Sequence, residues 1–135
     1  MAARAFASFS LVCRIVGRRL LVYDSFQGLP DEGQKLHVAA YSGHYGYYKE
    51  GMFCGRLEEV RENISKYGCL DVRDFVPGFF ATSLSPIGGP LVLGFLDVDL
   101  VDSTRACLQY IWPRLVENGV IYSDDAGDLD VVRIF

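Results

Sequence analysis

Two short apolar runs, each followed by acidic residues, constrain the fold of this chain of 135 residues more than any other feature. LVLGFL at 91–96 leads into Asp97-Val98-Asp99, and VIYS at 120–123 leads into Asp124-Asp125. A helix-like stretch separates them, so the pattern predicts a strand, a helix and a second, parallel strand. Because ligands bind at the carboxyl ends of strands in open α/β sheets, these carboxylates mark a candidate site.

The rest of the chain continues this alternation. We expect helices over 3–17, 56–67 and 103–117, and strands over 20–23, 71–76, 91–96 and 119–123. The third helix should be capped by Asp102 or Ser103 and kinked by Pro113. Residues 31–55 show no clear period and are expected to form a long loop or lid. Alternating strands and helices predict one α/β domain over 1–135, with a mostly parallel sheet.

Composition narrows the classes of function. Half of the residues are apolar, which allows a buried core, and the net charge is -4. Such a chain lacks the clustered Lys and Arg that neutralise phosphates, so we expect no nucleic-acid partner. Its apolar runs fall short of the ~18 residues of a membrane span, so we expect no membrane-spanning segment.

Cysteines and arginines bear on the compartment. The four cysteines, Cys13, Cys54, Cys69 and Cys107, are widely spaced and form no metal-binding motif, which predicts reduced thiols and a cytoplasmic protein. The first 23 residues contain four arginines and no acid, a composition typical of a mitochondrial transit peptide. A helix packed on the sheet is the simpler interpretation, because the stretch runs directly into an apolar strand.

The acidic residues suit a hard cation. If the strand pattern continued, Asp97 and Asp99 would face the same way, and Asp124 and Asp125 would add oxygens from the neighbouring strand end. Three carboxylates without a nearby His or Cys fit Mg²⁺, which prefers oxygen ligands, and a fourth is free to act as a base. A simpler alternative is that some of these acids only cap the helices that follow.

A phosphatase of the haloacid-dehalogenase type is another hypothesis for these acids. Its Asp-x-Asp-x-Thr/Val motif is matched by residues 97–101, with Asp124-Asp125 as a second acidic motif. That chemistry also needs a lysine between the two motifs, and this chain has no lysine after Lys66. The missing lysine weakens the phosphatase hypothesis.

A series of uncommon strings follows the chain from about residue 20 to residue 126. They are DSFQGLP (24–30), GMF (51–53), PGFFATSL (77–84), LDVDLVDST (96–104), WPRL (112–115), NGVI (118–121) and the pair Asp124-Asp125. In this order and spacing they resemble the macrocin O-methyltransferase family, S-adenosylmethionine-dependent enzymes that methylate sugar hydroxyls of antibiotics and related glycosides. The resemblance implies a Rossmann-like class I methyltransferase sheet and a small-molecule acceptor with a glycoside hydroxyl. The resemblance is also compatible with a homo-oligomer.

The resemblance also implies roles at the cofactor. Asp24 would hydrogen-bond the ribose of S-adenosylmethionine, because one carboxylate can accept from two neighbouring hydroxyls. Ser25 would lie beside it in the cofactor site, and Gly78 and Phe79 would border the adenine. The plain alternative for Asp24 is an acid that starts a turn.

At the acidic edge, the resemblance implies a metal site and a base. Asp97, Asp124 and Asp125 would hold Mg²⁺, and Asp99 would be the general base that takes the proton of the acceptor hydroxyl. His37 and His44 fall in the expected loop and receive no role, because a lone loop histidine is more often solvated.

The chain departs from the family pattern in three places. Val101-Asp102 stands where many members have Tyr-Glu, and Ala126-Gly127-Asp128 stands where an aromatic residue is usual. The family's first strand and its Gly-rich loop have no counterpart, and the chain contains no G-x-G. We therefore expect a sheet that is incomplete at the N-terminus. We also expect this chain alone to bind S-adenosylmethionine weakly or not at all and to show no methyl transfer. A truncated, non-catalytic remnant of the fold is the alternative.

Overall fold

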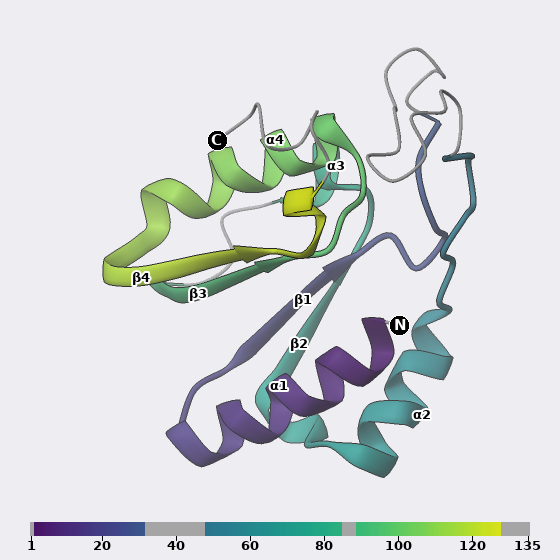
Figure 1. Ribbon diagram of the computed structural model, residues 1–135. Helices are drawn as coiled ribbons and strands as arrows, with labels where there is room; N and C mark the ends of the chain where they lie inside the picture. Colours follow the sequence, from purple (N-terminus) through teal and green to yellow (C-terminus); the bar gives the residue numbers. More distant parts are fainter. Residues whose placement is uncertain (1, 32–47, 85–88, 128–135) are drawn as a thin grey trace. The chain divides into compact units, whose positions relative to one another are not determined.

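The computed structural model describes residues 2–31, 48–84 and 89–127 (Figure 1). His37, His44 and most of the expected loop at 31–55 lie outside the described residues. The chain divides into two compact units. The first consists of Met1–Leu29 and Gly51–Phe79, and the second of Pro30–Glu50 and Phe80–Phe135.

The first unit is a pair of parallel strands packed against two helices (Figure 1). Strand β1 (Leu20–Asp24) pairs with β2 (Arg73–Pro77), so that Asp24 lies opposite Pro77. Helices α1 (Ala2–Val16) and α2 (Leu57–Tyr67) contact each other, and a 3-10 turn, η1 (Leu70–Val72), leads into β2. These elements confirm the helices expected over 3–17 and 56–67 and the strand over 20–23, and they shorten the strand expected over 71–76 at its start.

The core of this unit follows from helical spacing. Val60 and Ile64 lie one turn apart on α2, so both side chains point to one face of the helix and are buried there. They pack with Ala7 of α1, Val22 of β1 and Phe26, which follows β1. Ile64 has no exposed surface, which makes it the centre of this apolar cluster.

A close approach of α1 to the end of α2 fixes how the two helices meet. Gly68 follows α2, and a Cβ atom there would overlap Ser10 Oγ and lie 2.8 Å from the Ala7 carbonyl oxygen. The buried Ser10 hydroxyl donates to Ala7 O at 2.6 Å and accepts the Cys69 N–H at 2.9 Å. A side chain at 68 would therefore displace α1.

The arginines near the N-terminus belong to this fold. Arg14 pairs with Asp71, and Arg19 Nη2 lies 2.7 Å from Asp74 Oδ1. Both pairs are exposed, and such pairs contribute about 0–1 kcal/mol each. Helix α1 buries Ala7 in the core, and Arg14 and Arg19 pair with acids of the same unit, as the packed-helix interpretation expects.

The second unit contains the predicted strand, helix and strand. Strand β3 (Leu91–Leu96) pairs in parallel with β4 (Leu115–Ser123), and α4 (Val101–Ile111) connects them. Gly94 faces α4, since a Cβ atom there would lie 3.1 Å from Ile111 Cδ1. A short helix, α3 (Phe80–Ser83), precedes β3, and 3-10 turns η2 (Trp112–Arg114) and η3 (Asp124–Gly127) flank β4.

Three details of the segment from α4 to β4 differ from expectation. Helix α4 ends at Ile111, so Pro113 does not kink it but lies in η2, because a residue without an N–H cannot continue the helical hydrogen bonds. The N-cap is Leu100, without a side-chain cap, and the expected caps Asp102 and Ser103 lie inside the first turn. Strand β4 begins at Leu115, four residues before the predicted 119, with an irregular register between the pairs Leu91–Leu115 and Leu93–Val120.

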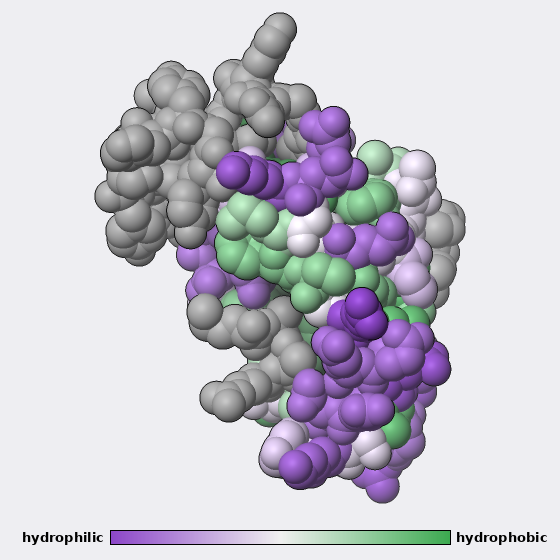
Figure 2. All heavy atoms as spheres, turned by 90° about the vertical axis from the view of Figure 1, so that its right-hand side faces the viewer, coloured by the Kyte–Doolittle hydropathy of each residue, from purple (hydrophilic) through white to green (hydrophobic). Residues whose placement is uncertain are grey.

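The α/β class and the parallel strand pairing are confirmed. Within the described ranges, the strands form two sheets of two strands each, β1–β2 and β3–β4, which agrees with the expectation of an incomplete sheet. In the part of the chain that the structure describes, no helix is long and apolar enough to cross a membrane. Apolar side chains also reach the surface, with Ile15 83% and Trp112 73% exposed. Figure 2 shows one face, on which hydrophobic and hydrophilic residues both occur.

Candidate functional site

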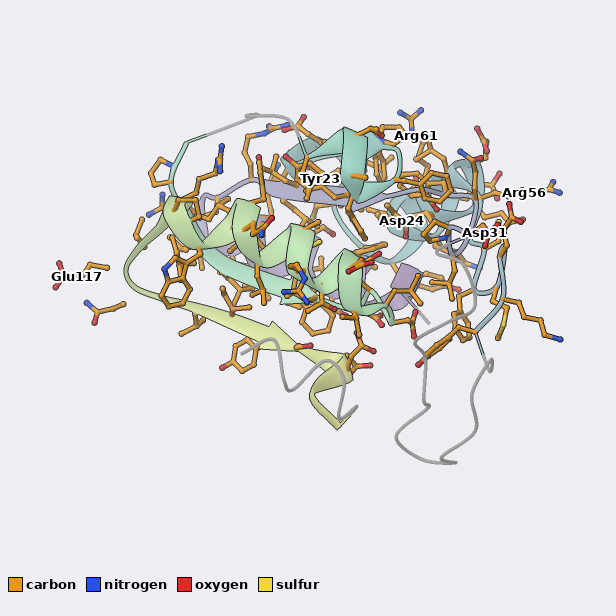
Figure 3. All side chains as sticks on the ribbon, turned by 90° about the horizontal axis from the view of Figure 1, so that it is seen from above. Tyr23, Asp24, Asp31, Arg56, Arg61 and Glu117 are labelled. Carbon is orange, nitrogen blue, oxygen red and sulfur yellow. The ribbon has the colours of Figure 1, made fainter. Side chains whose placement is uncertain are left out.

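The end of β1 brings two of the predicted cofactor residues together. Asp24 is the last residue of β1, directly after Tyr23 (Figure 3). Its main-chain oxygen accepts the Gly78 N–H at 3.0 Å, so the residues that follow β1 and β2 are adjacent. Gly78 has φ +138°, a conformation that side-chain-bearing residues rarely adopt. Phe79 follows it and is half-buried.

The turn after β1 is closed by its own polar groups. The Phe26 N–H donates to Asp24 Oδ1 at 2.7 Å, which fixes one carboxylate oxygen. The Ser25 hydroxyl donates to the Gly28 carbonyl oxygen at 2.7 Å and accepts the Gln27 N–H at 3.0 Å. Phe26 has φ +56°, an uncommon conformation for a residue with a Cβ atom. We call residues 24–29 the β1 turn.

The far end of the β1 turn is anchored to residues 51 and 52. Leu29 N–H donates to Met52 O, and Gly51 N–H donates to Leu29 O, both at 2.9 Å. Gly28 has φ +85°, and a Cβ atom there would lie 2.6 Å from Met52 O. Only glycine meets both requirements at this position, because it alone lacks a Cβ atom and adopts positive φ without strain.

The half-buried surroundings of Asp24 disfavour the ionised form of its carboxyl group. Burial raises the pKa of the Asp24 carboxyl above its usual range, and the hydrogen bond from the Phe26 N–H opposes this in part. A half-buried carboxylate with one donor in place gains from further hydrogen-bond donors. Hydroxyl groups of a ligand are donors of this kind.

Aromatic rings lie close to the β1 turn. Phe26 and Phe75 meet edge to face, with ring centroids 5.9 Å apart and an interplanar angle of 81°. The guanidinium groups of Arg73 and Arg61 lie 4.4 and 5.3 Å from the centroid of Phe75. The buried Phe26 thus links the β1 turn to the core of the first unit.

The second unit holds the acidic residues, in a turn rather than in a continued strand. Strand β3 ends at Leu96, the Leu100 N–H donates to Val98 O at 2.6 Å, and Asp99 has φ +60°. The expectation that Asp97 and Asp99 share one face by strand alternation is therefore wrong. The alternation of a strand requires extended backbone, and the left-handed conformation of Asp99 interrupts it.

Asp125 connects this turn to the end of β4. Its Oδ2 atom accepts both the Val98 N–H at 3.1 Å and the Asp99 N–H at 3.0 Å. One carboxylate oxygen thus holds two successive N–H groups of a turn that lies far away in the sequence. Asp124, its neighbour in η3, is exposed.

The acidic residues act on one another. Burial, together with the negative charges of Asp125, Asp97 and Asp124, raises the pKa of Asp99 to about 7. Asp125 thus lies beside the turn of residues 97–99, where the ends of β3 and β4 are adjacent.

The acidic residues match Mg²⁺ in the chemistry of their donor atoms but not in their arrangement. Carboxylate oxygens are the donors that Mg²⁺ prefers, and a cation would offset the repulsion around Asp99. Among the residues described here, however, no three His, Cys, Asp or Glu side chains form a group that could hold a metal ion. The assignment of Asp97, Asp124 and Asp125 as ligands stays a prediction.

Two features of the site escaped sequence reasoning. One is the pair of hydrogen bonds made by the Ser25 hydroxyl within the β1 turn. The turn-starting role of Asp24 was expected as an alternative and agrees with its bond from the Phe26 N–H. The other is the bond from Asp125 to the turn after β3. No local sequence pattern predicts that contact, because Asp125 is 26 and 27 residues away from its partners Asp99 and Val98.

Comparison with known proteins places the chain in a family. The sequence profile of the family "Macrocin-O-methyltransferase (TylF)" matches residues 6–135. One similar protein is the 8-demethyl-8-(2,3-dimethoxy-alpha-L-rhamnosyl)-tetracenomycin-C 4'-O-methyltransferase of Streptomyces olivaceus, 38% identical over 112 residues. Another is the demethyldecarbamoylnovobiocin O-methyltransferase of Streptomyces niveus, 34% identical over 114 residues. Each match covers 80% of this chain and 42% of the relative, so the chain spans less than half the length of these relatives.

Solved structures agree with these matches. The O-methyltransferase NovP superposes with a TM-score of 0.73 and 29% identity over 90% of this chain and 54% of its own. The calicheamicin methyltransferase CalS11 gives a TM-score of 0.60 at 22% identity, covering 82% of this chain and 47% of its own, and supports the fold alone. The resemblance seen in the sequence strings is thus confirmed, and the chain belongs to the macrocin-O-methyltransferase family.

Proposed function

We propose that the protein is an S-adenosylmethionine-dependent O-methyltransferase that acts on a hydroxyl of a glycoside or related natural product. The observation that carries this proposal is the pairing of Asp24 with Gly78 at the adjacent ends of β1 and β2, in a chain of this family. The names of the two Streptomyces relatives support an acceptor of this class. We also propose a cytoplasmic location, which the free thiols of the four cysteines support.

The first unit supplies the residues for the adenosine part of the cofactor. Asp24 Oδ1 already accepts the Phe26 N–H, which sets the orientation of the carboxylate and leaves Oδ2 for a ribose hydroxyl. Gly78 allows close approach to the adenine, and Phe79 offers an apolar ring beside it. Ser25, which the resemblance places beside Asp24 at the cofactor, belongs to the same turn and bonds the Gly28 carbonyl oxygen there.

The second unit supplies the acids. Asp97, Asp124 and Asp125 would hold Mg²⁺, which when bound lowers the pKa of the acceptor hydroxyls. Asp99 would accept the proton of the acceptor hydroxyl, and S-adenosylmethionine, when bound, would supply the methyl group. The family match favours this reaction over the phosphatase. A non-catalytic remnant is the outcome if the tests below find no cofactor binding.

Replacing Asp24 with asparagine should weaken binding of S-adenosylmethionine by about 10- to 100-fold, since hydrogen bonds to a charged group are worth ~1.5–3 kcal/mol. Asparagine keeps an oxygen for the Phe26 N–H but offers one acceptor atom instead of two. Equilibrium dialysis with labelled cofactor measures the change, in a series extending to millimolar concentrations. Asp74→Asn is the matched control, because that exposed acid of β2 pairs with Arg19. Equal affinities of the Asp24 variant and the parent would remove Asp24 from the cofactor site.

The same two variants should respond oppositely to pH in unfolding experiments. The pKa of Asp24 is raised in the fold, so the native state binds more protons than the unfolded state above pH ~4, and stability falls as pH rises through that window. Asp24→Asn should therefore stabilise the protein at pH 7 and lose this gain below pH ~4. The Arg19 hydrogen bond lowers the pKa of Asp74, so Asp74→Asn should lose stability at pH 7.

Titration with Mg²⁺ or Mn²⁺ by calorimetry tests the metal proposal. Asp124→Asn should weaken binding by about tenfold or more, because it removes a negatively charged oxygen donor. Asp124 is the better variant than Asp125, whose carboxylate also holds the Val98 and Asp99 N–H groups. Asp102→Asn, an exposed change in the first turn of α4, is the control. The same heats in all three proteins would exclude a metal role for Asp124.

A further inference from the structure

We propose that Ser25 is a positioning residue, which closes the β1 turn and thereby holds the Asp24 carboxylate ready for the hydroxyls of a nucleoside ribose. This inference rests on the proposed function and changes the role of Ser25 within it. Ser25 acts through Asp24 and does not itself contact the cofactor.

The contacts of the Ser25 hydroxyl support this role. A serine hydroxyl has one hydrogen to donate, and Ser25 gives it to the Gly28 carbonyl oxygen at 2.7 Å. The same oxygen atom accepts the Gln27 N–H at 3.0 Å. The donor of the hydroxyl is therefore committed inside the turn, and no hydrogen is left for a ligand.

The two hydrogen bonds of the Ser25 hydroxyl span Phe26, the residue whose N–H orients the Asp24 carboxylate. Phe26 lies between Ser25 and Gln27, and its N–H donates to Asp24 Oδ1 at 2.7 Å. Its φ of +56° is unfavourable for a residue with a Cβ atom, so the conformation persists only where its surroundings impose it. The Ser25 bonds on one side and the contact of the Phe26 ring with Phe75 on the other supply that constraint.

The other end of the enclosed segment cannot shift to compensate. Gly28, which receives the Ser25 hydrogen bond, fits closely against the backbone of residues 51 and 52, and Leu29 bonds to Met52 and Gly51. Ser25 thus connects an anchored point of the chain to the residues around Asp24. Without the hydroxyl, the peptide from 25 to 28 gains freedom, and the orientation of the Asp24 carboxylate is lost with it.

Loss of the Ser25 hydroxyl should loosen the turn without unfolding the protein. Gln27 is exposed, so water replaces the lost hydrogen bond to its N–H. The buried ring of Phe26 and the apolar cluster around Ile64 are untouched by the change. Amide exchange of Phe26 and Gln27 should accelerate in Ser25→Ala, while the unfolding midpoint stays close to that of the parent.

The binding test compares adenosine with 2′-deoxyadenosine, using the full chain and ligand-observed NMR, which detects millimolar affinities. The parent should prefer adenosine, and Ser25→Ala should lower this preference by about tenfold, since it weakens a charge-assisted hydrogen bond. Ser25→Thr keeps the hydroxyl and should restore most of the preference. Ser65→Ala, an exposed serine on α2, is the matched control and should change nothing.

A double-mutant cycle separates positioning from direct contact. If Ser25 acts through Asp24, Ser25→Ala should have no further effect on adenosine binding in an Asp24→Asn background. A full additional loss there, or weaker binding without faster Phe26 exchange, would mean that Ser25 touches the ligand, and the proposal would be wrong. A parent that does not prefer adenosine over 2′-deoxyadenosine would overturn the proposed function itself, and this inference with it. If the parent prefers adenosine and Ser25→Ala shows the same preference, only this inference would be overturned.

Discussion

Replacing Asp99 with asparagine is expected to reduce methyl transfer by about 10²- to 10⁴-fold, the usual contribution of a general base. Asparagine cannot take the proton of the acceptor hydroxyl, yet it suits the backbone, because Asn is among the residues that best tolerate the left-handed conformation of this position, φ +60°. The loss should therefore be chemical rather than structural. Transfer of a labelled methyl group to a glycoside acceptor, in a preparation with measurable turnover, is the assay.

Two further measurements make the Asp99 result specific. Adenosine binding should be unchanged, because the residues proposed to bind the nucleoside are Asp24 and Gly78. Asp102→Asn, an exposed acid three residues along the chain, should retain near-parental turnover. Turnover of Asp99→Asn close to that of the parent would reassign Asp99 to structure or to metal binding.

The Asp99 variant should also be more stable than the parent at neutral pH. Burial and the neighbouring carboxylates raise the pKa of Asp99 to about 7, against about 4 in an unfolded chain. Between these values the native state binds the extra proton, so stability falls as pH rises from about 4 to 7 and stays lower above 7. A neutral side chain avoids this loss. Higher stability with lower turnover would identify Asp99 as a residue kept for chemistry.

Ile64→Ala is expected to lower the free energy of unfolding by about 2–5 kcal/mol, the largest stability effect that we foresee. Ile64 has no exposed surface and lies at the centre of the cluster formed by Ala7, Val22, Phe26 and Val60, so truncation leaves a cavity between α1, α2, β1 and the β1 turn. Urea unfolding followed by circular dichroism at 222 nm measures the change, as that signal follows the helices.

Two companion variants keep this measurement interpretable. Ile15→Ala makes the same chemical change at a side chain of α1 that is 83% exposed, and should shift stability by no more than ~0.5 kcal/mol. Ile64→Val should cost about 0.5–1.5 kcal/mol and stays measurable even if the alanine variant unfolds. Similar losses at positions 15 and 64 would contradict the burial on which the core of this unit rests.

Elements whose signals are local were predicted well. The strand over 91–96 was found at the expected residues, because a short apolar run between a Gly-Pro turn and an acidic pair has little alternative. Helix α2 was recognised from Val60 and Ile64, one turn apart on a helix that ends before Gly68. The family resemblance assigned Asp24 and Gly78 to the same ligand, and a hydrogen bond joins them at the adjacent ends of β1 and β2.

Features that depend on distant contacts or on uncommon backbone were missed. Nothing in LVEN marks a strand, so β4 begins earlier than predicted, and Asn118 with φ +63° interrupts its register. The position of Asp99 could not be read from alternation, since β3 ends at Leu96 and alternation holds only in extended backbone. The contact of Asp125 with the turn after β3 depends on the whole second unit being folded.

The meeting of Ser10 with Gly68 has a consequence for how this protein can vary. A side chain at 68 displaces α1, and displacement of α1 deprives the Cys69 N–H of the Ser10 hydroxyl that it donates to. Substitutions at positions 10 and 68 should therefore occur only together, although each position holds an ordinary small residue in the sequence. Among homologues that dock a helix here, glycine at 68 should accompany a small hydroxyl at 10, and the two should be lost together where the helix is absent.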